Sequence, residues 1–80
     1  MKYSVHKAGL KAFGQRLRQL RKSRNLSQEE LAWKADSELS QISRMERGVI
    51  NTSLSQAFKV AEALEISLKE LFDFDLPKDE

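Results

Sequence analysis

Three Ser-x-x-Glu or Ser-x-x-Gln sequences restrict this chain to a largely helical fold. They begin at Ser27, Ser53 and Ser67, and each precedes apolar residues at helical spacing. In such a capping box the serine hydroxyl accepts a free backbone N–H of the first turn, while the glutamate or glutamine reaches back to the serine N–H. The sequence therefore predicts a helix start at each of the three serines.

Apolar spacing predicts two more helices. Leu10, Phe13, Leu17 and Leu20 recur at three- and four-residue steps, which places them on one helix face. A further helical segment ends at Gly48, a residue that commonly stops helices. Strand signals are missing, because β-branched alternation never lasts four residues. We expect an all-α fold of five helices, over residues 9–24, 28–35, 38–46, 54–64 and 68–73.

The composition excludes several kinds of catalytic and metal-binding site. The chain has 80 residues, which suit one domain, and it contains no cysteine and one histidine. We therefore expect no disulfide, no metal site made of thiolates or histidines, and no Ser-His-Asp triad. The sequence also contains no glycine-rich phosphate loop. We expect no enzymatic activity, no metal and no cofactor. A solvated acidic tail, rather than a metal site, is expected for Asp73, Asp75, Asp79 and Glu80.

Charge is unevenly distributed along the chain. Residues 1–48 hold 11 Lys and Arg against 5 Asp and Glu, a net charge of +6, whereas residues 49–80 hold 3 against 7, a net charge of −4. This asymmetry suggests one face for a polyanion, although a solvated charged surface is the alternative. No apolar run of ~18 residues and no signal peptide is present, so we expect a cytoplasmic protein without a membrane partner.

The predicted helices over 28–35 and 38–46 are short and are joined by Asp36 and Ser37. So tight a connection makes the two helices cross steeply, as in a helix-turn-helix, whose second helix fits the major groove of DNA. In that geometry Arg44 could form two hydrogen bonds with a guanine, and Gln41 could form two with an adenine. Ordinary solvent exposure is the alternative for each side chain. The residues exposed on the second helix are Leu39, Ser40, Gln41, Ser43, Arg44 and Arg47.

Residues 13–72 resemble the phage-repressor-like, or Xre-type, helix-turn-helix domain of transcription regulators. The resemblance rests on the stretches 13–21, 26–32, 42–48, 53–54, 61–64 and 67–72, together with Asn51. It implies a five-helix DNA-binding domain over 9–73, between an N-terminal arm at 1–8 and an acidic tail at 74–80. Single-domain controller proteins of restriction–modification systems and short phage repressors are similar in kind.

The resemblance also implies roles by position. Gln28 would bind a DNA phosphate at a helix N-terminus, which favours anions. Arg21 and Glu46 would form a partly buried salt bridge between the first and third helices. Base edges would be met by Leu39, Ser40, Ser43 and Arg44, and the sugar-phosphate backbone by Asn51 and Thr52.

Four departures from the family pattern surround the turn and the following loop. Asp36 stands where the family has glycine, and it is expected to adopt a left-handed conformation. Ser37 replaces an apolar residue, and Glu38 replaces a Ser or Thr cap, so we expect Ser37 to cap the helix one residue earlier. The loop residues Val49 and Ile50 lack the basic side chains often found there, so phosphate contacts of the loop should be mostly neutral hydrogen bonds.

Two aromatic features remain. Trp33 lies off the core spacing of its helix and is either exposed or covered by the arm around Tyr3 and Val5. We expect the arm to cover it. We expect His6 to be a solvated residue of the arm. The acidic half carries more apolar residues than one small core needs, which indicates an isologous homodimer interface. Closure of the monomer core is the alternative. The candidate interface residues are Phe58, Leu68, Leu71, Phe72 and Phe74.

These features together predict a sequence-specific DNA-binding transcriptional regulator. It would bind a palindromic operator as a homodimer, since one recognition helix reads few bases and a twofold dimer doubles the contacts. No small-molecule ligand is expected, and the cytoplasmic protein would be nucleoid-associated when bound to DNA. The alternative is the antitoxin of a toxin–antitoxin pair, which would bind both DNA and a toxin protein.

Overall fold

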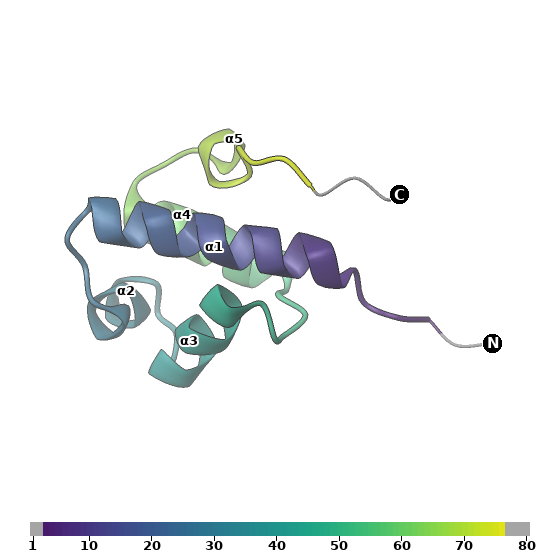
Figure 1. Cartoon of the computed structure of the whole chain (residues 1–80). Coiled ribbons are helices and arrows are strands. Elements are labelled where there is room, and N and C mark those ends of the chain that lie inside the picture. Colours follow the sequence, from purple (N-terminus) through teal and green to yellow (C-terminus); the bar gives the residue numbers. More distant parts are fainter. Residues whose placement is uncertain (1–2, 77–80) are drawn as a thin grey trace.

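The computed structural model describes residues 3–76 and folds into five helices, without a strand in that range. In Figure 1, α1 lies across the molecule, with α2 and α3 on one side of it and α5 on the other. The predicted all-α, five-helix fold is confirmed. Within residues 3–76, none of the helices combines the length and apolar character needed to cross a membrane. The helices are α1 (Lys7–Ser23), α2 (Gln28–Lys34), α3 (Leu39–Arg47), α4 (Leu54–Leu64) and α5 (Leu68–Leu71).

The first helix begins earlier than the sequence predicts. His6 is its N-cap, and the imidazole Nδ1 accepts a hydrogen bond from the Gly9 N–H at 2.9 Å. His6 is exposed, as expected, but it caps α1, so the helix begins within the arm expected over 1–8. Residues 1–2 of that arm, and residues 77–80 of the expected tail with Asp79 and Glu80, lie outside the described residues.

The three serines cap their helices as predicted, but the boxes differ. Each serine Oγ accepts the N–H three residues later at 3.0 Å. The reciprocal bond forms at Ser27, whose N–H donates to Glu30 Oε1 at 2.8 Å. These bonds to Ser27, first the one from its backbone, hold the pKa of Glu30 below its ordinary value of 4.5. The predicted bond from the Gln56 side chain back to the Ser53 N–H does not form, because the Gln56 amide donates to Ser37 instead.

The core lies where α1 packs against α3, with α2 and α4 closing the sides. Its largest fully buried side chains include Leu17 of α1, Ile42 and Met45 of α3, and Leu64 of α4. Leu71 of α5 completes the core at 0 % exposure. The expectation that Leu71 contacts a second subunit is therefore corrected: helical spacing within α5 turns this residue inward.

Two glycines allow α1 to lie directly on α3. A Cβ at Gly14 would collide with the carbonyl oxygens of Met45 and Glu46, so no larger residue fits between the two backbones. Gly48 ends α3 in the left-handed conformation, with φ of 70°, and its backbone lies against that of Lys11. This close packing fixes the position of α3 relative to the longest helix.

Candidate nucleic-acid interface

The turn between α2 and α3 has the tight geometry that the sequence predicts. Asp36 takes the left-handed conformation, with φ of 52°, and the Ser37 N–H donates to the Ala32 carbonyl at 2.9 Å. Ser37 does not cap α3, contrary to expectation. Glu38 is the N-cap, without a side-chain hydrogen bond, and the helix begins at Leu39 rather than one residue earlier.

The hydroxyl of Ser37 has a different partner. Gln56 of α4 donates from Nε2 to Ser37 Oγ at 3.0 Å, and the same amide lies 3.8 Å from the sulfur of Met45. Lys59, also on α4, donates from Nζ to the Asp36 carbonyl at 3.3 Å. Two side chains of α4 thus hold the turn where the family has an apolar residue. The departure at Ser37 was the available sequence signal, but it did not identify the partner.

The outer face of α3 carries the candidate base-contacting residues. Leu39, Ser40 and Arg44 are exposed, and Gln41 and Ser43 are half-buried. Opposite them, the inner residues of α3 are fully buried, so the helix cannot rotate without exposing its core face. The face is therefore presented in one fixed orientation.

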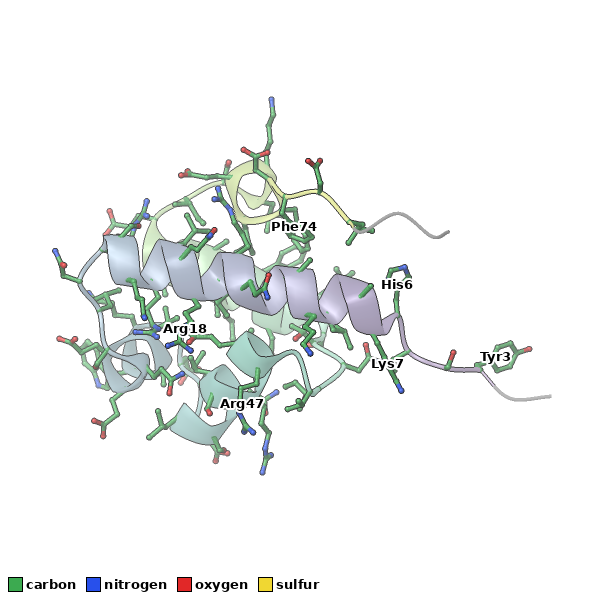
Figure 2. The ribbon with its side chains drawn as sticks, viewed as in Figure 1. Tyr3, His6, Lys7, Arg18, Arg47 and Phe74 are labelled. Atoms are coloured by element: carbon green, nitrogen blue, oxygen red, sulfur yellow. The ribbon has the colours of Figure 1, made fainter. Side chains whose placement is uncertain are left out.

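The flanks of α3 complete this surface. Arg47 is exposed and points from α3 away from α1 (Figure 2). After the left-handed Gly48, the loop brings exposed Asn51 and half-buried Thr52 to the start of α4. The two loop residues thus lie between α3 and α4, where the sequence predicts contacts with the DNA backbone.

A buried ion pair joins α1 to α3. The guanidinium of Arg21 meets the Glu46 carboxylate with Nε–Oε2 at 2.6 Å and Nη2–Oε1 at 3.0 Å, and its Nη1 donates to the Leu26 carbonyl at 2.8 Å. The structure thus contains the ion pair that the resemblance implies. Hydrogen bonding to Glu46 raises the pKa of Arg21 above its ordinary value. Because all three guanidinium nitrogens are engaged, the buried charge is fully compensated.

Gln28 extends this network to a third helix. It opens α2, and its Nε2 donates to Glu46 Oε1 at 3.0 Å. One amide hydrogen is therefore used inside the protein, and the second remains for another acceptor. The buried carboxylate of Glu46 orients the side chain that the resemblance assigns to a phosphate. Sequence reasoning paired Glu46 with Arg21 alone and missed this link.

The candidate dimer residues divide into two groups. Phe58, Leu68 and Phe72 are 49 %, 41 % and 46 % exposed, which leaves apolar surface on α4 and α5. Phe74 is half-buried and packs against the core, with its ring 6.1 Å from that of Phe72. Phe72 also stacks on Phe13 of α1 at 5.4 Å.

The position of α5 depends on a residue that sequence reasoning did not single out. Arg16 of α1 donates from Nε and Nη2 to the Glu70 carbonyl, at 3.1 and 2.9 Å. A guanidinium at the end of a helix satisfies carbonyls that lack helical partners. Arg16 thereby anchors the last turn of α5, beside the exposed Leu68 and Phe72.

The expectation that the N-terminal arm covers Trp33 is wrong. Trp33 is 84 % exposed and Tyr3 is 92 % exposed. Tyr3 precedes α1, whereas α2 follows the opposite end of that 17-residue helix, roughly 25 Å away at the helical rise of 1.5 Å per residue. Figure 2 shows Tyr3 extending away from the rest of the chain. The arm therefore does not reach α2.

Comparison with known proteins agrees with this geometry. The helix-turn-helix family model HTH_3 matches residues 17–71. Control protein C.BamHI of Bacillus amyloliquefaciens is 46 % identical over 63 residues, which cover 78 % of each chain. The restriction–modification controller protein C.AhdI of Aeromonas hydrophila has a similar structure, with a TM-score of 0.79 and 48 % identity over 81 % of this chain and 98 % of that one.

A more distant regulator shares the same fold. The clp gene regulator ClgR of Corynebacterium glutamicum has a TM-score of 0.75 and 27 % identity, over 79 % of this chain and 67 % of that one. The extent of the family match and the identity to C.BamHI and C.AhdI are decisive. This chain belongs to the helix-turn-helix (HTH_3) family, of Xre type, and its relatives there include restriction–modification controller proteins.

Proposed function

We propose that this chain, a DNA-binding transcriptional regulator, binds a palindromic operator as a homodimer and performs no catalysis. The observation that carries the proposal is the fixed outer face of α3, which presents Ser40, Arg44 and Arg47 to solvent. A helix of this size fits the major groove, where an arginine recognises guanine through two hydrogen bonds. The controller names of C.BamHI and C.AhdI support regulation of a restriction–modification system.

The proposed contacts with DNA fall into two groups, those with base edges and those with the sugar-phosphate backbone. Leu39, Ser40, Gln41, Ser43 and Arg44 would meet base edges, with Leu39 suited to a thymine methyl. Two sites would hold the sugar-phosphate backbone, the start of α2 on one side of α3 and the loop after α3 on the other. Such contacts set the register of the protein on the duplex but carry no sequence information directly. The backbone contacts would be made by Gln28, Asn51 and Thr52, with Arg47 at the edge of the groove.

The homodimer rests on the apolar surface of α4 and α5. Phe58, Leu68 and Phe72 are partly exposed there, with half-buried Phe74 at the margin. The chain after residue 48 has a net charge of −4 and suits contact with protein better than contact with DNA. To bind adjacent major grooves, the homodimer must place its two copies of α3 about 34 Å apart, one turn of DNA.

The controller function is favoured over the antitoxin alternative. C.BamHI and C.AhdI, both of which cover most of this chain, are named as control or controller proteins. An antitoxin would need a second surface for a toxin, and the apolar face of α4 and α5 already serves the homodimer. The proposal therefore requires DNA and a second copy of the chain as binding partners.

Selection of bound sequences from random duplex DNA tests the proposal. A palindromic consensus with half-site centres one helical turn apart, about 10 base pairs, is the expected result. A consensus without twofold symmetry, or no enrichment at all, would contradict it. Measuring the mass of the selected complex in solution then gives its stoichiometry, for which two chains per duplex are expected.

A further inference from the structure

We propose that Lys7 and Lys11 of α1 form a further phosphate-binding site, in addition to the start of α2 and the loop after α3, and next to that loop. This inference rests on the proposed function, which it extends to a helix without an assigned role in DNA binding. The loop after α3 lacks cationic side chains. The loop carries Val49 and Ile50 in place of basic residues, and its candidate contacts, Asn51 and Thr52, are uncharged. Counterion release on DNA binding needs cationic groups near the phosphates.

The basic residues of α1 fall into two groups, those with partners within residues 3–76 and those without. The helix contains no acidic residue and six basic ones. Two of the six have partners inside the protein: Arg16 binds the Glu70 carbonyl and Arg21 binds Glu46. At 100° per residue the remaining four lie within an arc of about 60°, and the two engaged arginines lie outside that arc. The four residues within the arc are Lys7, Lys11, Arg18 and Lys22.

This arc faces the side of α1 where α3 lies. Gly14, at the margin of the arc, touches the α3 backbone. Figure 2 shows Lys7 pointing to the same side of α1 as Arg47, whereas His6, its neighbour, points the other way. Arg21–Glu46 is the one ion pair within residues 3–76, so Lys7 and Lys11 have no carboxylate at salt-bridge distance there. Both lysines are exposed.

The loop lies beside the first turns of α1. Gly48 contacts the backbone of Lys11, and Lys7 is one helical turn away on the same side. On the other side of α1, His6 and Leu10 line a groove together with both Asn51 and Thr52. The lysine pair is therefore adjacent to the start of the loop at Gly48, on the side of α1 where α3 lies, while Asn51 and Thr52 follow on the other side. The position suits a phosphate next to those contacted by Asn51 and Thr52.

The salt dependence of binding gives the direct test. Operator affinity is measured at several salt concentrations between about 50 and 200 mM, and removing one lysine–phosphate interaction should reduce the magnitude of the negative slope of log K against log salt by about 0.9. In a homodimer, Lys7→Ala or Lys11→Ala should therefore reduce the slope by about 1.8, and the double variant by about 3.6. Base preferences should not change, because phosphate contacts carry no sequence information directly.

Two controls separate charge from folding. Lys7→Arg with Lys11→Arg keeps both charges and should keep the wild-type slope. Lys69→Ala removes one exposed charge from α5, on the opposite side of α1 (Figure 1), and should also leave the slope unchanged. Thermal unfolding should be the same for all variants, since the lysines lie outside the core.

Neutral methylphosphonates at single positions of the duplex locate the site. The wild-type protein should lose affinity at a phosphate adjoining those of the loop, and the double alanine variant should not respond there. Operator binding with the wild-type slope in the double alanine variant would overturn this inference alone. A wild-type protein that binds no duplex would overturn the proposed function and this inference with it.

Discussion

Gln56 and Ser37, 19 positions apart, are joined by a hydrogen bond from the amide Nε2 to the hydroxyl Oγ at 3.0 Å. The bond connects α4 to the turn of the helix-turn-helix. The same helix carries the exposed Phe58, so α4 connects the candidate dimer surface to the turn that positions α3. The capping of α4 by Ser53 does without the glutamine side chain, which is thereby free for this role.

Breaking this bond should weaken operator binding more than binding to scrambled DNA. Ser37→Ala or Gln56→Leu should each lower the free energy of unfolding by about 0.5–1.5 kcal/mol, the usual net contribution of a hydrogen bond. The double variant should cost less than the sum of the two, because neither partner is then left unpaired. Ser55→Ala, an exposed change on the same helix, is the matched control. Equal losses on both duplexes would contradict a positioning role.

Removing either member of the Arg21–Glu46 pair should cost about 3–5 kcal/mol, because an uncompensated charge is left buried. Urea unfolding of Arg21→Ala, Glu46→Ala and the double variant gives the coupling energy. Glu46→Ala should also leave the Gln28 side chain disordered, because Gln28 loses its hydrogen-bond acceptor. A coupling energy near zero would refute the ion pair as a source of stability.

The stability of the protein should fall with acid partly through Glu30. Its pKa is lower in the folded state than its ordinary 4.5, because the ionised form accepts the Ser27 N–H. Its ionised form therefore stabilises the fold above pH 4.5, and this contribution is lost as the pH falls through the lowered folded-state pKa. The difference in unfolding free energy between wild type and Glu30→Gln should shrink on acidification.

The control for this pH dependence is Glu29→Gln, in the same turn of α2 and also exposed. Its difference from the wild type should change less with pH, because Glu29 makes no capping bond. A Glu30→Gln difference that stays constant from ~pH 6 to ~pH 3 would contradict the assignment.

Charge placed on the α4–α5 face should separate the proposed dimer without unfolding the chain. Phe58→Glu and Leu68→Glu affect partly exposed side chains and should give monomers in sedimentation equilibrium, with thermal unfolding still cooperative. Leu71→Ala should instead cost about 2–5 kcal/mol, because it leaves a cavity in the core. If the wild-type protein stays monomeric at every accessible concentration, the homodimer is wrong.

Local sequence patterns predicted the five helices because capping serines and apolar spacing act within a few residues. The early start of α1 was missed because histidine is an uncommon cap, and His6 had no apolar pattern before it. Leu71 and Phe72 are adjacent apolar residues, and the spacing within α5 turns Leu71 inward only once the docking of α5 on α1 is known. The Gln56–Ser37 bond depends on the crossing of α4 and the turn, which no local pattern encodes.

Paired site selection with the wild-type protein and Arg44→Ala tests the central claim most directly, namely that the outer face of α3 reads the bases. Arg44→Ala should cost about 1–3 kcal/mol on the preferred site and should abolish the preference at one base position in each half-site. Preferences at the other positions should persist, since the remaining α3 side chains are unchanged. Identical base preferences for the two proteins would contradict the assignment of α3 as the recognition helix.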